Sequence, residues 1–369
     1  MRFILDLRVA SEHFPGIGRY GTGIARALPQ FLKEDEELVF IRDPEHCSFP
    51  FPSGEKVKTI DIPGSPFSLA QQWLIPAAIR AMRPCLYHSL YYVMPYRPGT
   101  TTVLTVHDLI PLLYPRSVSL RARILFRPLF CLALSASSGF IAVSRTTLDD
   151  LKAHFNIGQK KAIVISLAAD PDFRPRSPAE METVRLKYGL QGEFILYVGS
   201  QKPHKNLKNL LRAFAQVEAH ANATLAIAGP GGSDFRKLKA LAAELGVEES
   251  VRWLGRVPDS DLPVLYSAST AFVFPSLYEG FGLPVLEAMA CGAPVACSDI
   301  PALREVAGDA ALYFNPRSPD SMAMAIEAIL GNLELRKNLA ERGLERASAF
   351  SWDEAARKTV AFYREIAGG

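Results

Sequence analysis

The chain alternates short apolar runs, rich in β-branched residues, with segments of helical periodicity, and this alternation occurs twice. The strands expected from the first set lie at 2–7, 37–41, 57–62, 85–89, 101–106, 138–143 and 162–166. Those expected from the second set lie at 194–200, 223–229, 251–255, 270–276, 294–299 and 310–314. Solid apolar runs are typical of parallel strands covered on both faces. The pattern predicts two doubly wound α/β units.

A proline-rich and charge-rich stretch, 170–189, separates the two sets and indicates a linker with a short helix. A chain of 369 residues is also too long for one ordinary core. The expected domains are 1–172 and 173–350, followed by a helical segment, 351–369. That segment carries a stripe at helical spacing, which predicts a core-facing helix. The stripe consists of Trp352, Ala356, Val360 and Tyr363.

The composition excludes several classes of protein. The net charge of +3 gives no argument for a nucleic-acid partner. The five cysteines occur singly, without a CxxC pair, which favours reduced thiols in the cytoplasm over disulfides or a zinc site. No apolar run reaches the about 18 residues of a spanning helix, and the N-terminus does not have the pattern of a signal peptide. We therefore expect a cytoplasmic protein that needs no metal, with peripheral membrane contact as an option.

The segment YEGFGLPVLEAMACGAPVACSD, Tyr278 to Asp299, places two carboxylates in otherwise apolar surroundings. Buried carboxylates require partners. A helix is expected from Leu283 to Cys291, and its free N–H groups form a ready site for an anion such as a diphosphate. Glu279 and Glu287 are then placed to accept hydrogen bonds from hydroxyls, Glu287 from a vicinal diol such as ribose. The alternative is that Glu279 caps the helix and Glu287 is solvated.

The stretch VGSQKPHKNLKNLL follows the first strand of the second set and offers a second place for phosphate. Lys202, His204 and Lys205 lead into a helix, so cationic side chains lie beside a helix N-terminus. Ordinary surface lysines are the alternative interpretation.

In the first domain, FPGIGRYGTG contains Gly16-x-Gly18-x-x-Gly21. The dinucleotide fingerprint must open immediately after the first strand, whereas this motif begins about eight residues later, so that interpretation is rejected. A glycine-rich loop facing a ligand is expected instead, with Arg19 able to reach a phosphate. His107 follows a hydrophobic strand at its carboxyl end, where ligands of such sheets bind, and is either functional or structural.

Two further stretches have two interpretations each. Arginines alternate with Leu, Ile and Phe over 115–135, which indicates either a basic amphipathic helix on an anionic leaflet or a helix with arginine stems at its edge. The aromatic stretch 86–96 either stacks on an acceptor sugar or forms a buried cluster.

The motif E-G-F-G-L-P-x-L-E-A-M-A-x-G-x-P-V resembles the signature of the retaining glycosyltransferases of family 4, and G-S-x-K-P-x-K-N and the two-domain layout fit the same family. The resemblance covers essentially the whole chain. It implies a GT-B fold of two Rossmann-like domains across a cleft, with the last helix crossing back to the N-terminal domain. It also implies an N-terminal acceptor-binding domain and a C-terminal donor-binding domain.

Carried over by position, the resemblance implies a role for each matching residue. Glu279 contacts the donor sugar, Lys205 the diphosphate, and His107 the sugar and acceptor. Glu287 binds the ribose, and Arg256 and Val257 lie where the nucleobase binds. The remaining donor-binding positions are Gly16, Gly18, Arg19, Ser200, Lys202, Gly280, Phe281, Gly282, Leu283 and Val285.

Many members of the family have an arginine where this chain has Ser200. The subset with Ser or Thr there resembles mannosyl- and hexosyltransferases of polysaccharide assembly. The resemblance therefore implies transfer of a hexose, with GDP-mannose as the first candidate donor and UDP- or dTDP-hexoses next. A lipid-linked saccharide of surface polysaccharide is the expected acceptor. A nucleotide-sugar epimerase, a phosphorylase and a catalytically silent binding scaffold are the alternatives.

Overall fold

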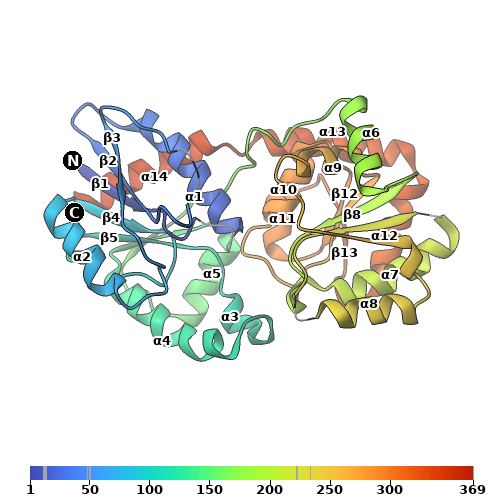
Figure 1. Ribbon diagram of the computed structural model, residues 1–369, viewed down its shortest axis with the longest axis horizontal. Coiled ribbons are helices and arrows are strands. Elements are labelled where there is room, and N and C mark those ends of the chain that lie inside the picture. The colour runs from blue at the N-terminus through green and yellow to red at the C-terminus, as the bar shows by residue number, and fades with distance from the viewer. Residues whose placement is uncertain (11–14, 48, 50, 222, 233, 369) are drawn as a thin grey trace. The chain divides into compact units, whose positions relative to one another are not determined.

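The structure is a computed structural model that describes residues 1–10, 15–47, 49, 51–221, 223–232 and 234–368. Its residue contacts divide the chain into two compact units, Met1–Ala168 with Ser351–Gly369 (unit 1) and Ala169–Phe350 (unit 2). Each unit is an open parallel sheet with helices on both faces (Figure 1). The predicted α/β class is therefore confirmed, and each predicted strand segment overlaps one strand of the structure.

The sheet of unit 1 has the order β3-β2-β1-β4-β5-β6-β7. Ile4 on the central β1 pairs with Val39 on one side and Tyr87 on the other. The strands are β1 (Arg2–Asp6), β2 (Glu37–Arg42), β3 (Val57–Asp61), β4 (Leu86–Ser89), β5 (Thr102–Val106), β6 (Gly139–Ala142) and β7 (Lys161–Val164). The helices are α1 (Pro15–Ala27), η1 (Leu28–Phe31), α2 (Gln71–Met82), α3 (Ile110–Leu113), η2 (Pro115–Ser117), α4 (Leu120–Ala136), α5 (Arg145–His154) and α14 (Trp352–Ala367).

The sheet of unit 2 has the order β10-β9-β8-β11-β12-β13, which is the Rossmann order of two half-sheets running outward from a central pair. Its strands are β8 (Phe194–Val198), β9 (Thr224–Ala228), β10 (Val251–Gly255), β11 (Ala271–Phe274), β12 (Val295–Ser298) and β13 (Leu312–Phe314). Its helices are α6 (Pro178–Tyr188), η3 (Pro203–Lys205), α7 (Leu207–Ala221), α8 (Phe235–Glu244), η4 (Glu248–Ser250), α9 (Leu262–Ala268), α10 (Leu283–Ala290), α11 (Pro301–Ala307), α12 (Pro319–Gly331) and α13 (Leu333–Ser348).

The last helix, α14, packs within unit 1. Ala356, Val360 and Tyr363 are at most 1% exposed, so the predicted core-facing stripe is confirmed. Trp352 begins the stripe and lies against α1 at Gly23, where an added Cβ would come within 2.2 Å of the indole. Only glycine fits this crossing, because a Cβ at that distance would overlap the ring.

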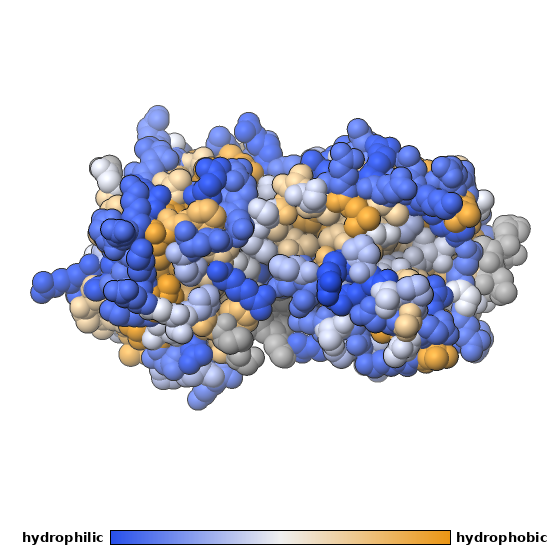
Figure 2. Space-filling view, turned by 90° about the horizontal axis from the view of Figure 1, so that it is seen from above, coloured by the Kyte–Doolittle hydropathy of each residue, from blue (hydrophilic) through white to orange (hydrophobic). Residues whose placement is uncertain are grey.

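Figure 2 shows one face of the protein, on which hydrophilic residues predominate and apolar areas are interrupted by polar side chains. None of the helices in the described ranges is long and apolar enough to cross a bilayer.

Candidate functional site

The two loops that carry the main sequence motifs meet at the centre of the unit 2 sheet. β8 and β11 are neighbouring parallel strands, and connections from them diverge to opposite edges of the sheet. Ligands of open α/β sheets bind at this switch point, beyond the carboxyl ends of the strands. The loop 199–206 follows β8 and the loop 275–282 follows β11. They are joined by the Leu277 N–H, which donates to the His204 carbonyl at 2.8 Å.

Lys205 and Glu279 form an ion pair between these loops. The Lys205 ammonium donates to Glu279 Oε1 at 2.6 Å, and the side chains are only 14% and 10% exposed. The ammonium also lies 5.1 Å from the ring centroid of Phe274, the last residue of β11. A mostly buried cation and anion at a switch point form a compact polar site with an apolar floor. A ligand with both an anionic group and hydroxyls matches its two partners.

The floor of this site includes Tyr197, which sequence reasoning did not single out. Its ring stacks near Phe274, with centroids 6.4 Å apart, and its hydroxyl donates to the Ser200 carbonyl at 2.8 Å. Burial raises the pKa of Tyr197 well above its ordinary value, and the nearby Glu279 carboxylate adds to the effect. The hydroxyl therefore stays protonated and holds the backbone of the loop 199–206.

Asn206, which follows Lys205, holds the end of the loop 199–206 in place, and it was also missed as a site residue. Its backbone is left-handed, with φ of 63°, and its side-chain amide donates to the carbonyls of Pro275 at 3.0 Å and Pro316 at 2.7 Å. Asparagine tolerates this conformation better than most residues. The K-N pair preceding a helix is the signal that points to such a turn.

The start of α10 provides the second part of the site. Gly282 precedes the helix with φ of 106°, and its carbonyl accepts from the Val285 N–H at 3.0 Å. Gly280, Phe281 and Leu283 are buried around this turn. The first amides of α10 therefore sit directly after Glu279, at the positive end of the helix dipole.

Glu287 lies one turn into α10 and is 1% exposed, so the alternative of a solvated glutamate is wrong. The Tyr266 hydroxyl, from α9, donates to Glu287 Oε2 at 3.1 Å. Burial, with the carboxylate next in effect, raises the pKa of the Cys291 thiol.

Substitution of Gly282 by alanine is expected to lower the free energy of unfolding by about 1–2 kcal/mol. The backbone at this position has a φ of 106°, which residues with a Cβ rarely adopt, and the new Cβ would lie 2.4 Å from Leu303 Cδ2. Urea unfolding of unit 2, followed by Trp253 fluorescence, measures the change. Gly331→Ala is the matched control, because no atom lies within 4 Å of its added Cβ. Equal stability of the two variants would contradict the prediction.

The other predicted residues of unit 2 lie near the same sheet edge. Ser200 is half-buried and Lys202 is exposed in the loop after β8. Arg256 is exposed and Val257 is buried, directly after β10. Gly229, directly after β9, donates its N–H at 2.7 Å to the carbonyl of Gly255, the last residue of β10. This bond joins the carboxyl ends of the two strands.

The predicted glycine-rich loop of unit 1 is wrong for the residues that the structure describes. Gly16, Gly18 and Arg19 lie in α1, which begins at Pro15. Gly16 is exposed, and Gly18 and Arg19 are half-buried. These residues therefore belong to a helix and not to a loop.

His107 follows β5 and is held by its neighbours. Its Nε2 lies 3.1 Å from the Leu90 carbonyl, and the Tyr20 ring meets it edge-on with centroids 5.1 Å apart. Burial lowers the pKa of His107 to about 4. A neutral imidazole that donates to the Leu90 carbonyl from Nε2 presents Nδ1 as an acceptor.

A buried hydrogen-bond chain runs behind His107. Tyr20 and Thr105 hydroxyls lie 3.1 Å apart, Thr105 lies 2.7 Å from His88 Nε2, and His88 Nδ1 lies 2.6 Å from the Tyr363 hydroxyl. The chain links α14 to the ring that packs on His107. Sequence reasoning missed His88, whose signal is a polar residue inside the apolar run CLYHS. The stretch 86–96 thus contributes to the core, with Tyr87 and Met94 in its main cluster.

Acidification is expected to destabilise unit 1 through His88. Burial lowers the pKa of His88 to about 3, so the unfolded chain takes up a proton that the folded chain refuses. The stabilisation is complete above the unfolded pKa of about 6.5 and is lost as the pH falls toward 3, which amounts to about 2 kcal/mol by pH 5. Urea unfolding at pH 7 and pH 5 tests this. His88→Gln should flatten the pH dependence by that amount, and an unchanged slope would contradict it.

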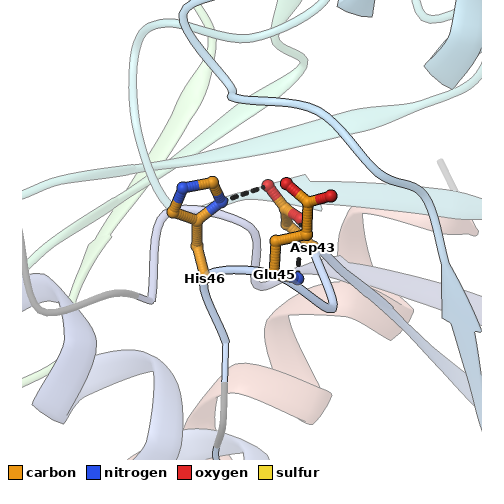
Figure 3. Close-up of side chains that lie close together, drawn as sticks. All are labelled: Asp43, Glu45 and His46. Carbon is orange, nitrogen blue, oxygen red and sulfur yellow. Dashed lines mark hydrogen bonds and ion pairs between the residues drawn. The ribbon is translucent and has the colours of Figure 1, made fainter.

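One group of metal-type donor atoms occurs among the described residues, at Asp43, Glu45 and His46 (Figure 3). Asp43 Oδ1 accepts from the Glu45 N–H at 3.1 Å, and His46 Nδ1 lies 2.8 Å from Asp43 Oδ2. These are the bonds of an aspartate-stabilised turn after β2. They account for the position of the His46 ring beside Asp43.

Two family descriptions match the chain. "Glycosyl transferases group 1" matches residues 182–346, and "Glycosyltransferase Family 4" matches residues 15–173. The chain is 36% identical to the O-antigen chain mannosyltransferase B of Escherichia coli over 295 residues, which are 78% of this chain and 76% of that protein. It is 30% identical to the E. coli serotype-specific mannosyltransferase WbdA over 272 residues, 70% of this chain, but it spans only 33% of that longer protein.

The fold matches solved structures over its full length. The crystal structure of Anabaena HepE in complex with UDP and glucose superposes with a TM-score of 0.77, at 19% identity, covering 99% of both chains. At 19% identity the structural similarity supports an assignment of the fold alone, which is GT-B. Taken with the sequence matches over both units, it leads to one assignment: the chain belongs to the group 1, family 4 glycosyltransferases.

Proposed function

We propose that the chain transfers a hexose, with retention of anomeric configuration, from a nucleotide-diphosphate sugar to an acceptor hydroxyl. The observation that carries this proposal is the Lys205–Glu279 pair, 2.6 Å apart and mostly buried at the switch point of unit 2. A diphosphate satisfies the ammonium, and sugar hydroxyls satisfy the carboxylate. Unit 2 is accordingly assigned the donor, and unit 1 the acceptor.

The transition state places negative charge on the departing diphosphate, and groups held in place beforehand stabilise that charge. Lys205 supplies a point charge, and the backbone at Gly282, Leu283 and Val285 supplies the positive end of a helix. Ser200 and Lys202, in the loop after β8, complete the phosphate side. No divalent ion has a role in this scheme.

The remaining roles follow the family motif. Glu279, with the backbone of Phe281 and Gly282, binds the transferred sugar, and Glu287 binds the ribose. Arg256 and Val257 flank the nucleobase. For unit 1, the proposed roles are contact with the sugar and the acceptor for His107, and contact with the diphosphate for Gly16, Gly18 and Arg19 of α1.

Mannose from GDP-mannose is the proposed donor substrate, because the E. coli relative that shares 36% identity is named an O-antigen chain mannosyltransferase. A UDP-hexose is the second candidate, since the structurally similar HepE was crystallised with UDP and glucose. A lipid-linked saccharide at the inner face of the cytoplasmic membrane is the proposed acceptor, with segment 115–135 against the leaflet.

A panel of GDP-, UDP- and dTDP-sugars tests the proposal by thermal unfolding, because a ligand bound only by the folded protein raises Tm. The donor that raises Tm most is then incubated with and without a mannose-terminated acceptor, and products are read by NMR. An α-linked product from an α-linked donor supports the proposal. Conversion of the donor to its epimer without acceptor supports an epimerase instead, and nucleotide binding without any turnover supports a scaffold.

A further inference from the structure

Unit 1 carries large apolar side chains that point into solvent from α2 and from the residues just before it. Four of them lie within one short stretch, and each is about half exposed or more. They are Phe67 (48% exposed), Leu69 (77%), Trp73 (67%) and Leu74 (49%). Isolated surface leucines are ordinary, whereas a contiguous group that includes an exposed tryptophan marks a place of interaction.

Helix α4 has a second group of the same kind. Its buried stripe faces the sheet through Phe126, Phe130, Ala133 and Leu134. Its outward side still presents large apolar residues, namely Leu120 (70% exposed), Ile124 (64%), Leu125 (38%) and Leu132 (48%). A surface helix normally turns mainly polar residues outward, whereas this helix also exposes large apolar side chains beside its arginines.

The two groups lie on the same side of one sheet. Ile75 of α2 and Phe126 of α4 belong to a single hydrophobic core, and Figure 1 shows both helices below the strands of unit 1. The segment between them is tied to each. Tyr96 N–H donates to Gln72 on α2 at 2.9 Å, and the Tyr92 ring lies 5.0 Å from that of Phe126. We call the two exposed groups together the α2–α4 face.

The sequence that contains α2 and α4 carries mostly positive charge. From Ile62 to Leu148 the chain has eight arginines, no lysine and a single acidic residue, Asp108, although the whole chain has a net charge of only +3. The rest of the chain is therefore net negative. All eight arginines are exposed, and four of them lie in α4 or just before it, namely Arg116, Arg121, Arg123 and Arg127.

The exposed apolar side chains and the arginines together distinguish between three possible binding partners of the α2–α4 face. A second copy of the chain would bring the same arginine-rich region against itself, and like charges repel. A nucleic acid would satisfy the arginines but would leave four or more large apolar side chains without an apolar partner. The surface of an anionic bilayer offers phosphate groups to the arginines and an apolar layer beneath them.

We infer that the α2–α4 face binds the surface of an anionic lipid bilayer, with Trp73 and Ile124 in the interfacial layer and the arginines on lipid phosphates. The inference goes beyond contact by segment 115–135, because it adds a second, aromatic anchor from 67–74. It does not depend on which sugar is transferred, and vesicle binding is measured without donor or acceptor.

Flotation with vesicles of phosphatidylglycerol and phosphatidylethanolamine tests the inference on the full chain, with phosphatidylcholine vesicles as the reference. Binding is expected to the anionic vesicles and to weaken as salt is raised. Arg121→Gln with Arg123→Gln should weaken binding about 25-fold, at about fivefold for each arginine lost. Trp73→Ser with Ile124→Ser should weaken it at least tenfold, since both side chains lose an apolar environment.

Matched controls separate this face from general surface effects. Leu333→Ser removes an apolar side chain that is 59% exposed, and Arg236→Gln removes an exposed arginine, both in unit 2. Neither should change binding by more than about twofold, within the range of ordinary surface substitutions. The tryptophan emission should shift to the blue on binding through Trp73, the exposed member of three tryptophans.

Three results would overturn the inference. The first is no flotation with anionic vesicles at low salt. The second is equal loss of binding in the control and the face variants. The third is self-association, by analytical ultracentrifugation, that Trp73→Ser abolishes, since that would make the face a contact between copies. Loss of sugar transfer with vesicle binding intact would count against the proposed reaction only.

Discussion

Replacement of Lys205 by alanine is expected to slow sugar transfer about a thousandfold at saturating donor, the size of effect seen when one preorganised stabiliser of a developing anion is removed. The ammonium is 2.6 Å from Glu279 and mostly buried, whereas Lys202 in the same loop is exposed, so we expect Lys202 to compensate only weakly for the lost charge. Initial rates with purified donor and acceptor measure the loss. Lys208→Ala, an exposed lysine on α7, is the matched control and should keep its rate.

The same substitution leaves Glu279 without its cation, and this should destabilise unit 2. Breaking one side of a buried ion pair costs about 3–5 kcal/mol, and the residual exposure of both side chains here reduces that to about 2 kcal/mol. Low activity of Lys205→Ala could then result from loss of folded protein alone. The double variant Lys205→Met with Glu279→Gln removes both charges at similar volume, and it should recover most of the stability.

The double variant separates the two explanations. If Lys205 stabilises the leaving diphosphate, the double variant is stable and still slow. Recovery of transfer together with stability would show that the pair serves the fold alone, and near-normal turnover of Lys205→Ala would contradict the assigned role outright.

The architecture was predictable because its signal is local. The central strands are short apolar runs such as FILYV and TVLTV, and a parallel sheet buried on both faces requires such runs. The pairing of Lys205 with Glu279 was not predictable in detail, because 74 positions separate them. The strand order that makes β8 and β11 neighbours brings them together, and that order is a tertiary property.

The helix α1 shows why one local inference failed. Four glycines in PGIGRYGTG suggest a loop, since glycine disfavours helices by about 1 kcal/mol for each residue. Packing outweighs that preference here. A Cβ at Gly21 would lie 3.0 Å from Ala10 Cβ, and one at Gly23 would overlap Trp352 of α14. At these two positions the glycines serve the close packing of a helix, and the residue that requires Gly23 lies at the far end of the chain.

Glu287→Gln is expected to weaken binding of the donor nucleotide about 100-fold, because a carboxylate that accepts from two ribose hydroxyls contributes two charge-assisted hydrogen bonds. The side chain is 1% exposed and has the Tyr266 hydroxyl at 3.1 Å. The substitution keeps its shape, so a change in affinity reports on the charge. Isothermal titration calorimetry with the preferred nucleoside diphosphate measures it.

A structural role for Glu287 predicts a different pattern, and two comparisons distinguish them. Tyr266→Phe removes the protein donor but leaves the carboxylate, and should change the affinity less than about threefold if ribose is the main partner, as for one neutral hydrogen bond. A 2′,3′-dideoxy nucleotide lacks the diol, so wild type should bind it about 100-fold more weakly than the ribonucleotide, whereas Glu287→Gln should bind both alike. Discrimination that survives in Glu287→Gln would assign the carboxylate to the packing of α9 against α10, because only a group that touches the diol can sense its removal.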